Sequence, residues 1–428
     1  MKQVEKYTLW LGLAAASILL MAIVADWNGL IAPLAVVSAI ALSIGIRSVE
    51  SLKSYQYTAW ILVAIVCGMF YPSAFLKWGD FDLRNKWLIL IVIQVVMFGM
   101  GTQMSIKDFY GIKTMGKGVL VGILCQFSIM PIVGYLLTRV FTFEPEIAAG
   151  IILIGSCSSG LASNVMVFIA KANLTLSVTL TAVATLLAPI MTPLMMKLLA
   201  GTYVEVNFLK MCTDIIKMVI VPIGAALLYD AYAHGSITFK KRVNVLFILA
   251  ISWLLSMFLG LWDFLESRFS TNILLILELI NFLFGIVIVG KLYFHLVSLK
   301  PKIHTLMPLL SMFGIVYFTT VTTAASRDNI LTIGVFILLA SIIHNTLGYT
   351  FGYWISRALG LDKDSSRTVA LEVGLQNGGM ASGLAGSMGK LATVGLAAAV
   401  FSPWMNISGS ILANYWRKKK EVLSNNSV

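Results

Sequence analysis

One carboxylate in the sequence lies where a charge is costly. Glu372 stands inside an apolar run over 365–388, in the segment LEVGLQNGGMASG. A carboxylate at membrane depth is unfavourable unless it is neutralised or coordinated. Gln376 and Asn377 follow within about two helical turns of it. Hard cations prefer carboxylate, amide and carbonyl oxygens as ligands, so we predict that Glu372 binds a cation.

The sequence leaves three other roles open for Glu372. It could form an ion pair with Lys217 or Lys291, the two basic residues inside apolar runs. It could lie at the membrane interface, since its helix could begin only at Arg367. It could instead be the proton site of a proton-coupled carrier or a cation/proton exchanger. Dependence of uptake on the bound cation at fixed pH would separate that last function from coupling to a metal cation.

A second group of oxygen-bearing side chains precedes a Thr-rich apolar run. Ser177 and Thr181 are four residues apart, so they share one face of a helix. Each hydroxyl alone is typical of a side chain that bonds to the carbonyl one turn earlier. Asn164 ends the segment GSCSSGLASN, which is as polar and Gly-rich as the segment around Glu372. We predict that the two hydroxyls lie beside Asn164 and Glu372.

These two Gly-rich segments are poor membrane helices. Gly in a helix interior is less favourable than Ala by about 1 kcal/mol, and backbone exposed to lipid without partners is more costly still. Such segments persist where the helix is broken and lines a polar cavity. The N-termini of half-helices carry partial positive charge. Partial positive charge of this kind would suit an anion beside Asn164 and Asn377.

The composition indicates a protein of the lipid bilayer. Of 428 residues, 59% are hydrophobic and 12% are charged, and the mean hydropathy is +0.90. Soluble domains carry roughly 25% charged residues, which excludes an ordinary cytosolic enzyme. No nucleophilic triad or metal spacing supports an intramembrane enzyme. The net charge of +12 is explained by basic cytoplasmic loops and not by nucleic-acid binding.

Fourteen apolar runs predict fourteen membrane helices and an all-α integral membrane protein. If the N-terminus is cytoplasmic, twenty Lys and Arg residues fall on the cytoplasmic side and nine on the other. This bias predicts an inner-membrane protein with both termini in the cytoplasm. The runs are 8–25, 29–46, 57–76, 87–104, 116–138, 146–170, 174–196, 207–231, 244–262, 271–296, 303–324, 329–356, 365–388 and 391–414.

A short internal repeat predicts inverted topology. The segment SGLAS at 159–163 resembles GGMAS at 378–382, at an offset of 219 residues. The first copy lies in the sixth run and the second in the thirteenth, so an odd shift separates them and they enter the membrane from opposite sides. We predict a first repeat over 1–203, a second over 204–416, and a basic cytoplasmic tail over 417–428.

Several motifs together resemble those of a known transporter family. They are MFGMG at 97–101, KDF at 107–109, Gln126-Phe127, LASNVM at 161–166, KANLTLSVTLT at 171–181, AP-x-x-TP at 188–193, HNTLGY at 344–349 and EVGLQN at 372–377. Over about 57–232 and 303–416 the sequence is similar to the bile acid:sodium symporter family. Members of that family have ten helices in two inverted repeats of five. Their core domain holds two crossed, broken helices and packs against a panel domain.

The resemblance also implies the ligands of two sodium ions. Its first sodium site maps to Ser163, Asn164, Ser177, Thr181 and Glu372. Its second site maps to Gln126, Glu372 and Gln376, with the carbonyls of Val373 and Leu375. The implied function is symport of a small organic anion, such as a bile-acid-like molecule, a carboxylate or a sulfonate, by alternating access. For the anion we expect contacts at Gly160, Leu161, Asn164, Asn377 and Gly378.

The sequence departs from the family at two points. Leu161 stands where relatives often have Thr, two residues before the Ser-Asn pair, so the known substrates of the family do not carry over directly. Two helix pairs, at about 8–46 and 244–296, are additional. We expect each pair to precede the shared helices of its half, to widen the panel and to leave the core unaltered. The sequence does not predict the oligomeric state.

Overall fold

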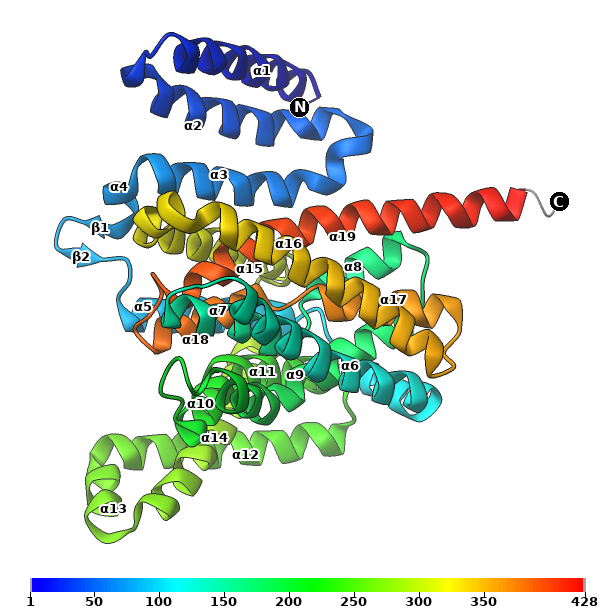
Figure 1. Ribbon diagram of the computed structural model, residues 1–428. Helices are drawn as coiled ribbons and strands as arrows, with labels where there is room; N and C mark the ends of the chain where they lie inside the picture. The colour runs from blue at the N-terminus through cyan, green and yellow to red at the C-terminus, as the bar shows by residue number, and fades with distance from the viewer. Residues whose placement is uncertain (1, 426–428) are drawn as a thin grey trace.

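The computed structural model describes residues 2–425, and these form an almost entirely helical protein (Figure 1). The α-helices are α1 Lys2–Val24, α2 Asn28–Gly45, α3 Gln56–Phe70, α4 Pro72–Leu76, α5 Lys86–Gly101, α6 Gly111–Val140, α7 Pro145–Ser156, α8 Leu161–Ile169, α9 Leu174–Met195, α10 Phe208–Ile215, α11 Val221–His234, α12 Ile237–Ser256, α13 Trp262–Arg268, α14 Thr271–Leu299, α15 Lys302–Ala325, α16 Arg327–Ala358, α17 Lys363–Gly374, α18 Gly378–Ser387 and α19 Val394–Asn425.

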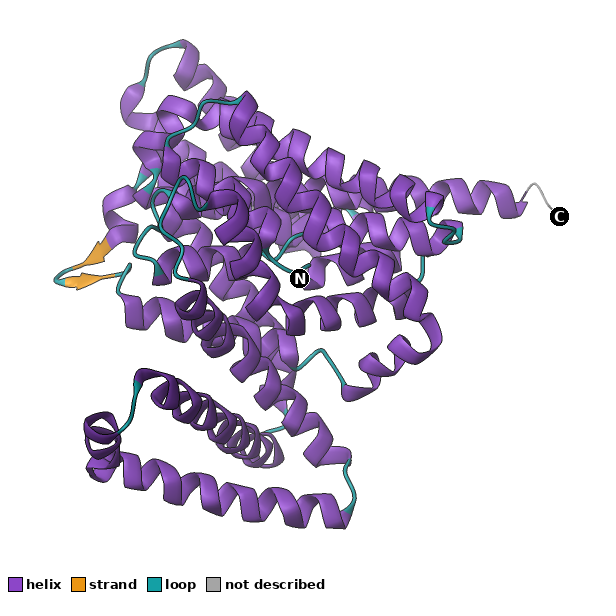
Figure 2. Cartoon of the chain, turned by 60° about the horizontal axis from the view of Figure 1, so that its bottom comes forward, coloured by secondary structure: helices purple, strands orange, loops and turns teal. Residues whose placement is uncertain are grey.

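Shorter elements join or continue these helices. Three 3₁₀ segments lie at Ile46–Ser48, Glu50–Tyr55 and Ile106–Tyr110, and three π-helical segments lie at Met196–Ala200, Ile216–Ile220 and Met257–Leu261. The π-helical segment at Ile216–Ile220 makes α10 and α11 one continuous span. A two-stranded antiparallel hairpin, β1 Lys77–Trp78 and β2 Phe81–Asp82, projects from one end of the molecule (Figure 2).

All fourteen predicted runs are helical. Within the described residues, ten helices are long and apolar enough to cross a membrane. The other four runs hold the shorter helices α3 and α5 and the two interrupted pairs α7–α8 and α17–α18. The prediction of an all-α membrane protein with two discontinuous helices is therefore confirmed.

Side-chain caps fix where several helices begin. Asn85 accepts a hydrogen bond from the Trp87 amide at the start of α5, at 2.9 Å. Asn173 accepts one from the Leu176 amide at the start of α9, at 3.1 Å. A capping side chain satisfies an amide that the helix itself leaves unpaired. The backbone amide of Asn173 also donates to the Thr368 hydroxyl of α17, at 3.0 Å. The capping residue of α9 therefore also contacts α17.

Eight helices form one layer. Their order across the layer, from the contacts between neighbours, is α1, α2, α3, α15, α5, α11, α14 and α12. Figure 1 shows this row from the blue helices at the top to the green helices at the bottom. Figure 2 shows α12 and α14 as a hairpin, joined through α13, at the edge of the molecule.

A second group of helices forms a more buried unit. It contains α6, the broken pairs α7–α8 and α17–α18, and α9, α16 and α19, which contact one another extensively. About two thirds of the most apolar stretch of α19 is buried, compared with 6% for α12 and 6% for α14. The row meets this unit where α5 and α10 contact α18 and where α15 contacts α19.

The additional helix pairs extend the row at its two opposite ends. The first pair, α1 and α2, precedes α3, as expected. The second pair, α12 and α14, follows α11, which contacts α5 just as α3 contacts α15. The expectation that each pair precedes the shared helices of its half is therefore wrong for the second pair. The two additional pairs therefore lie at opposite ends of the row, although they are inserted at different positions in the two halves of the chain.

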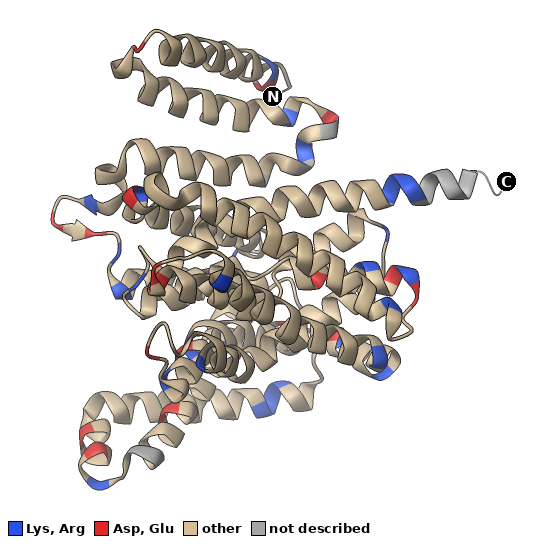
Figure 3. Ribbon diagram, viewed as in Figure 1, with Lys and Arg blue, Asp and Glu red and all other residues tan. Residues whose placement is uncertain are grey.

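Charged side chains lie mainly near the helix ends, and the middle of the molecule is largely uncharged (Figure 3). Lys217 is an exception, because it stands within the span Phe208–His234. Its ammonium group lies 2.5 Å from the Glu278 carboxylate of α14 and 5.3 Å from the centre of the Phe282 ring. This ion pair ties the second additional pair to the rest of the row.

Candidate ion and substrate site

The two broken helices cross at their interruptions. An isolated antiparallel bridge pairs Ser159 with Gln376. The Gly160 amide donates to the Leu375 carbonyl at 3.1 Å, and the Asn377 amide donates to the Ser158 carbonyl at 2.8 Å. A Cβ on Gly160 would lie 3.0 Å from the Gln376 carbonyl oxygen, so this close approach favours glycine. The predicted crossing of two discontinuous helices is present.

Side chains from neighbouring helices satisfy the carbonyls that the breaks expose. A helix leaves its last carbonyls without internal partners, and in a membrane such groups are costly. The bonds are Thr192 Oγ1 to the Ser156 carbonyl at 2.7 Å, Gln126 Nε2 to the Cys157 carbonyl at 3.0 Å, Gln376 Nε2 to the Val373 carbonyl at 2.6 Å, and Asn345 Nδ2 to the Gly374 carbonyl at 2.8 Å. Specific side-chain donors therefore stabilise the non-helical backbone at each break.

Glu372 lies in the last turn of α17, beside the crossing, and is 2% exposed. Three hydroxyls from α8 and α9 donate to its carboxylate. Ser163 and Ser177 reach Oε1 at 2.6 and 2.5 Å, and Thr181 reaches Oε2 at 2.9 Å. Asn164 completes the group, because its Oδ1 accepts from Ser177 at 2.7 Å and from Thr181 at 3.3 Å. All five residues of the first predicted site converge.

This cluster contains more acceptor oxygens than hydrogens. Three hydroxyl hydrogens serve the two oxygens of Glu372, Oδ1 of Asn164 and the Gly160 carbonyl, which lies 2.7 Å from Ser163 Oγ. Among the described residues no basic side chain contacts Glu372. An oxygen-rich, negatively charged group of this kind suits a hard cation such as sodium.

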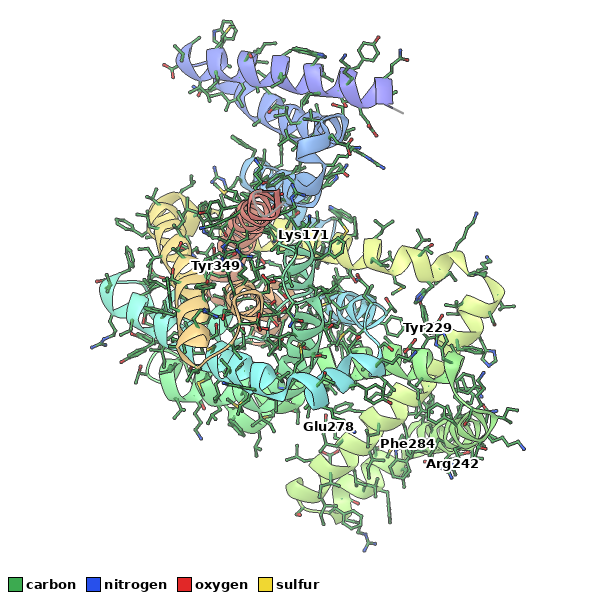
Figure 4. The ribbon with its side chains drawn as sticks, turned by 90° about the vertical axis from the view of Figure 1, so that its right-hand side faces the viewer. Lys171, Tyr229, Arg242, Glu278, Phe284 and Tyr349 are labelled. Atoms are coloured by element: carbon green, nitrogen blue, oxygen red, sulfur yellow. The ribbon has the colours of Figure 1, made fainter. Side chains whose placement is uncertain are left out.

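The alternative ion pairs for Glu372 are not formed. Lys217 contacts Glu278, and Lys291 contacts the amide oxygen of Asn244. The interfacial alternative also fails, because Glu372 is buried and lies nine residues into α17. Glu278 lies on the projecting outer hairpin, whereas Tyr349 lies within the buried unit (Figure 4). Lys217 and Lys291 therefore contact other residues and not Glu372.

The second predicted set is also brought together. Gln126, which is 2% exposed, donates through Nε2 to Oε1 of Gln376 at 2.9 Å. Its own Oε1 is buried and has no hydrogen-bond partner. An unpaired buried acceptor costs on the order of 1–3 kcal/mol, and a cation would remove that cost. The carbonyls of Val373 and Leu375 belong to the adjacent break, so this donor set fits a second sodium ion.

The five residues predicted to contact the anion flank the crossing. Gly160 and Leu161 begin α8, and no side chain caps that helix. Asn377 caps α18 by accepting from the Met380 amide at 3.0 Å, and is 4% exposed. Asn164 belongs to the ion cluster described above. Gly378 begins α18, and a Cβ there would lie 2.0 Å from Ser402 Oγ of α19.

Sequence reasoning missed several polar residues near the site. On α19, Ser402, Asn406 and Ser410 are buried at 7%, 4% and 1% exposure. Their spacing of four residues in an apolar helix is the signal that could have identified them, because it places them on one face. Asn345 and Thr192, which hold the break carbonyls, lie within recognised motifs but were given no role.

A cavity of about 420 Å³ lies where the row meets the buried unit. Its lining includes Lys210 and Asp214 of α10 and Leu384 and Ser387 of α18. Leu384 is seven residues along α18 from Asn377, which corresponds to roughly 10 Å along a helix. The cavity therefore opens near one end of a helix whose other end is at the crossing.

Comparison with known proteins places the chain in a family. The model of the Sodium Bile acid symporter family matches residues 90–263. The uncharacterized sodium-dependent transporter YocS of Bacillus subtilis is 31% identical over 375 residues, which cover 87% of this chain and 94% of the relative. The chain belongs to the sodium bile acid symporter family.

Other relatives of this chain come from plants and animals. The probable sodium/metabolite cotransporter BASS1, chloroplastic, of Arabidopsis thaliana is 28% identical and aligns over 85% of this chain and 74% of its own length. The human ileal sodium/bile acid cotransporter is 26% identical and aligns over 68% of this chain and 66% of its own length. These relatives are transporters, so at the family level the chain is a sodium-dependent multi-pass membrane transporter and not an enzyme.

Proposed function

We propose that the protein is a symporter that carries a small organic anion together with two sodium ions. The observation that carries this proposal is the convergence of three hydroxyls on Glu372, two of which also reach Asn164 Oδ1, without a basic partner for Glu372 among the described residues. The unpaired Gln126 Oε1 on the other side of the break supports a second ion.

The two ions share one carboxylate in this proposal. Ser163, Asn164, Ser177, Thr181 and Glu372 hold the first ion. Gln126, Glu372 and Gln376, with the carbonyls of Val373 and Leu375, hold the second. Ion binding neutralises Glu372 and links α8, α9 and α17 through common ligands. The crossing becomes rigid only when both halves of the chain supply their ligands, and this couples ion binding to the arrangement of the broken helices.

The anion binds at the crossing on the side of the two half-helix N-termini. The uncapped amides that begin α8 carry partial positive charge. Gly160, Leu161, Asn164, Asn377 and Gly378 surround that position. A bile-acid-like molecule, a carboxylate or a sulfonate has the required charge. Because two sodium ions and one monoanion carry one net positive charge across the membrane, transport is electrogenic.

Alternating access follows from the two layers of the molecule. The buried unit of α6–α9 and α16–α19 moves against the row of outer helices, and the cavity between α10 and α18 is the opening on one side. The proposed setting is the bacterial inner membrane with both chain termini in the cytoplasm. The two repeats divide near residue 204.

The test compares sodium with choline at fixed pH in the purified protein. Ligand stabilisation equals RT ln(1 + [L]/Kd), about 2.7 kcal/mol at a hundredfold excess, so sodium should raise the melting temperature measurably. A bile acid, a short hydroxycarboxylate and an alkyl sulfonate should then be screened with and without sodium. A response that depends on pH but not on sodium would overturn the proposal in favour of a proton-coupled carrier.

A further inference from the structure

Asn345 is a buried amide whose polar groups are both engaged. It lies on α16 and has no exposed surface. Its Nδ2 donates to the carbonyl of Gly374, the last residue of α17 before the break, at 2.8 Å. Its Oδ1 accepts from Ser408 Oγ of α19, at 2.5 Å. The Tyr349 hydroxyl lies 3.3 Å from the same Ser408 oxygen. Asn345 therefore connects α19 to the end of the half-helix that carries Glu372.

The inverted repeat gives Asn345 a counterpart. Gln126 precedes it by 219 residues, the offset that also relates SGLAS at 159–163 to GGMAS at 378–382. Gln126 lies on α6 and donates to the Cys157 carbonyl at the first break, at 3.0 Å. Each of these two helices contacts the broken helix that follows it in its own half. Each half thus holds the end of its broken helix with a buried amide from the preceding helix.

The two amides differ in what their oxygens do. Gln126 keeps an unpaired Oε1 that can serve as a ligand. The oxygen of Asn345 accepts from Ser408 of α19 and is therefore not left unpaired as Gln126 Oε1 is. Its donor acts on the carbonyl of Gly374, which stands between the two residues that supply backbone ligands, Val373 and Leu375. In the first half of the repeat the buried amide, Gln126, can thus act as a ligand. In the second half the corresponding amide, Asn345, holds the backbone at the break.

Gly374 needs such a support. A Cβ at this position would lie 2.1 Å from the Tyr349 ring, so the packing of Tyr349 favours glycine there. Glycine is the residue whose backbone is least restricted. The peptide that follows Gly374 is held by two bonds, from Asn345 to its carbonyl and from its Leu375 amide to the Leu371 carbonyl at 3.0 Å. Loss of the Asn345 bond leaves the backbone free to turn at the break.

We propose that Asn345, oriented by Ser408, is a positioning residue that fixes the Gly374 carbonyl and thereby aims the Val373 and Leu375 carbonyls at the second sodium ion. This inference rests on the proposed sodium symport. It assigns Asn345 no contact with the ion. Its effect is on the affinity for sodium and on the cooperativity between the two ions.

The test uses Asn345→Leu, which keeps the side-chain size and removes the donor, and Ser408→Ala, which keeps Asn345 and removes the orienting bond together with the longer contacts of that hydroxyl to Tyr349 and Met405. The matched control is Ser356→Ala, because Ser356 is equally buried on α16 but bonds to the carbonyls of Gly352 and Tyr353 in its own helix. Sodium titrations of the melting temperature give the half-saturating concentration and the Hill coefficient, and the sodium-free melting temperature reports the fold. Wild-type protein is titrated in parallel.

We expect Asn345→Leu to raise the half-saturating sodium concentration about tenfold, the effect of one hydrogen bond, and to lower the Hill coefficient towards one. Ser408→Ala should raise that concentration about threefold, and Ser356→Ala should leave it within twofold. An unchanged half-saturating concentration in Ser408→Ala and in any folded Asn345→Leu overturns the inference, even if the sodium-free melting temperature falls. No sodium response in the wild type overturns the proposed function itself.

Discussion

The crossing of the broken helices and the outer helix pairs solve the problem of polar groups in a membrane in different ways. At the crossing, Glu372 and its three hydroxyl partners are 2% exposed or less, and side chains donate to the carbonyls at the breaks. On the outer pair α12–α14 only 6% of each span is buried. Its polar contacts include the bond from Trp253 to Asn281 within the pair and the ion pair of Glu278 with Lys217 of the neighbouring span.

This comparison indicates which part of the molecule can bind an ion selectively. Polar atoms in a membrane are stable only with partners. At the crossing the partners come from four helices of both halves, and they leave a surplus of acceptor oxygen. On the outer pair the described polar contacts join single partners, such as Trp253 with Asn281 and Lys291 with Asn244. We therefore expect substitutions at the crossing to change ion response and those on the outer pairs to change stability.

The largest effect is expected for Glu372→Gln. This change keeps the shape of the side chain and removes the charge that both proposed ions share. Sodium-driven uptake and sodium-induced stabilisation should both be lost, because unpaired cations are strongly disfavoured in a buried site. Uptake into proteoliposomes and the melting temperature in sodium and in choline provide the measurements. A full sodium response in this variant would make Glu372 a structural carboxylate.

A smaller effect is expected for Ser177→Ala. The Ser177 hydroxyl lies 2.5 Å from the Glu372 carboxylate but is one ligand among several. Half-saturating sodium should rise about tenfold, the magnitude of one charge-assisted hydrogen bond, while the maximal uptake rate stays measurable. Thr185→Ala is the control on the same helix, since the Thr185 hydroxyl bonds to the Thr181 carbonyl of its own helix. Equal sodium titrations in both variants would contradict the site.

Where the outer pair contacts the neighbouring span, we expect a substitution to change the stability and not the response to sodium. Lys217→Met should lower the melting temperature by several degrees, because it leaves Glu278 without its partner in the membrane. Adding Glu278→Leu should recover most of the loss, as replacement of both charges by apolar groups is often neutral. The sodium titration should not move in any of these proteins. A shift of the half-saturating concentration in the double variant would show that the outer pair contributes to the ion site.

The smallest effect is expected for the exposed hairpin. The hydrogen bond from the Arg84 side chain lowers the pKa of Asp82 to about 2. A lowered folded-state pKa stabilises above the unfolded value near 3.8 and loses its contribution as the pH falls towards 2. Asp82→Asn should therefore lower the melting temperature slightly at pH 7 and leave it unchanged at pH 2. A larger loss at pH 2 than at pH 7 would contradict this account.

Local chemistry made the crossing predictable from the sequence. The Gly-rich segments around Gly160 and Gly378 predicted the breaks. The spacing of Ser177 and Thr181 predicted two hydroxyls on one face of a helix. The family resemblance added Gln126 and the break carbonyls to the expected ligands. Every one of these residues lies at the crossing, because the requirement for polar partners in a membrane leaves few other arrangements.

Contacts between distant helices were beyond the reach of the sequence. Nothing local to Lys217 identifies Glu278 as its partner, since 61 residues and several helices separate them. Asn345 lies in the middle of an unbroken helix, so its role depends on a break in α17 that its own neighbours do not reveal. That α14 and not α12 packs along α11 likewise follows from packing and not from the order of the chain.

Sodium stoichiometry tests the central claim most directly. Equilibrium binding of radioactive ²²Na⁺ to the purified protein at saturating sodium should give two ions per chain for the wild type. Gln126→Leu removes the unpaired oxygen of the second site and should bind one ion, and Glu372→Gln should bind none. Two ions bound by Glu372→Gln would contradict the account, because neither ion would then depend on the carboxylate that both are proposed to share.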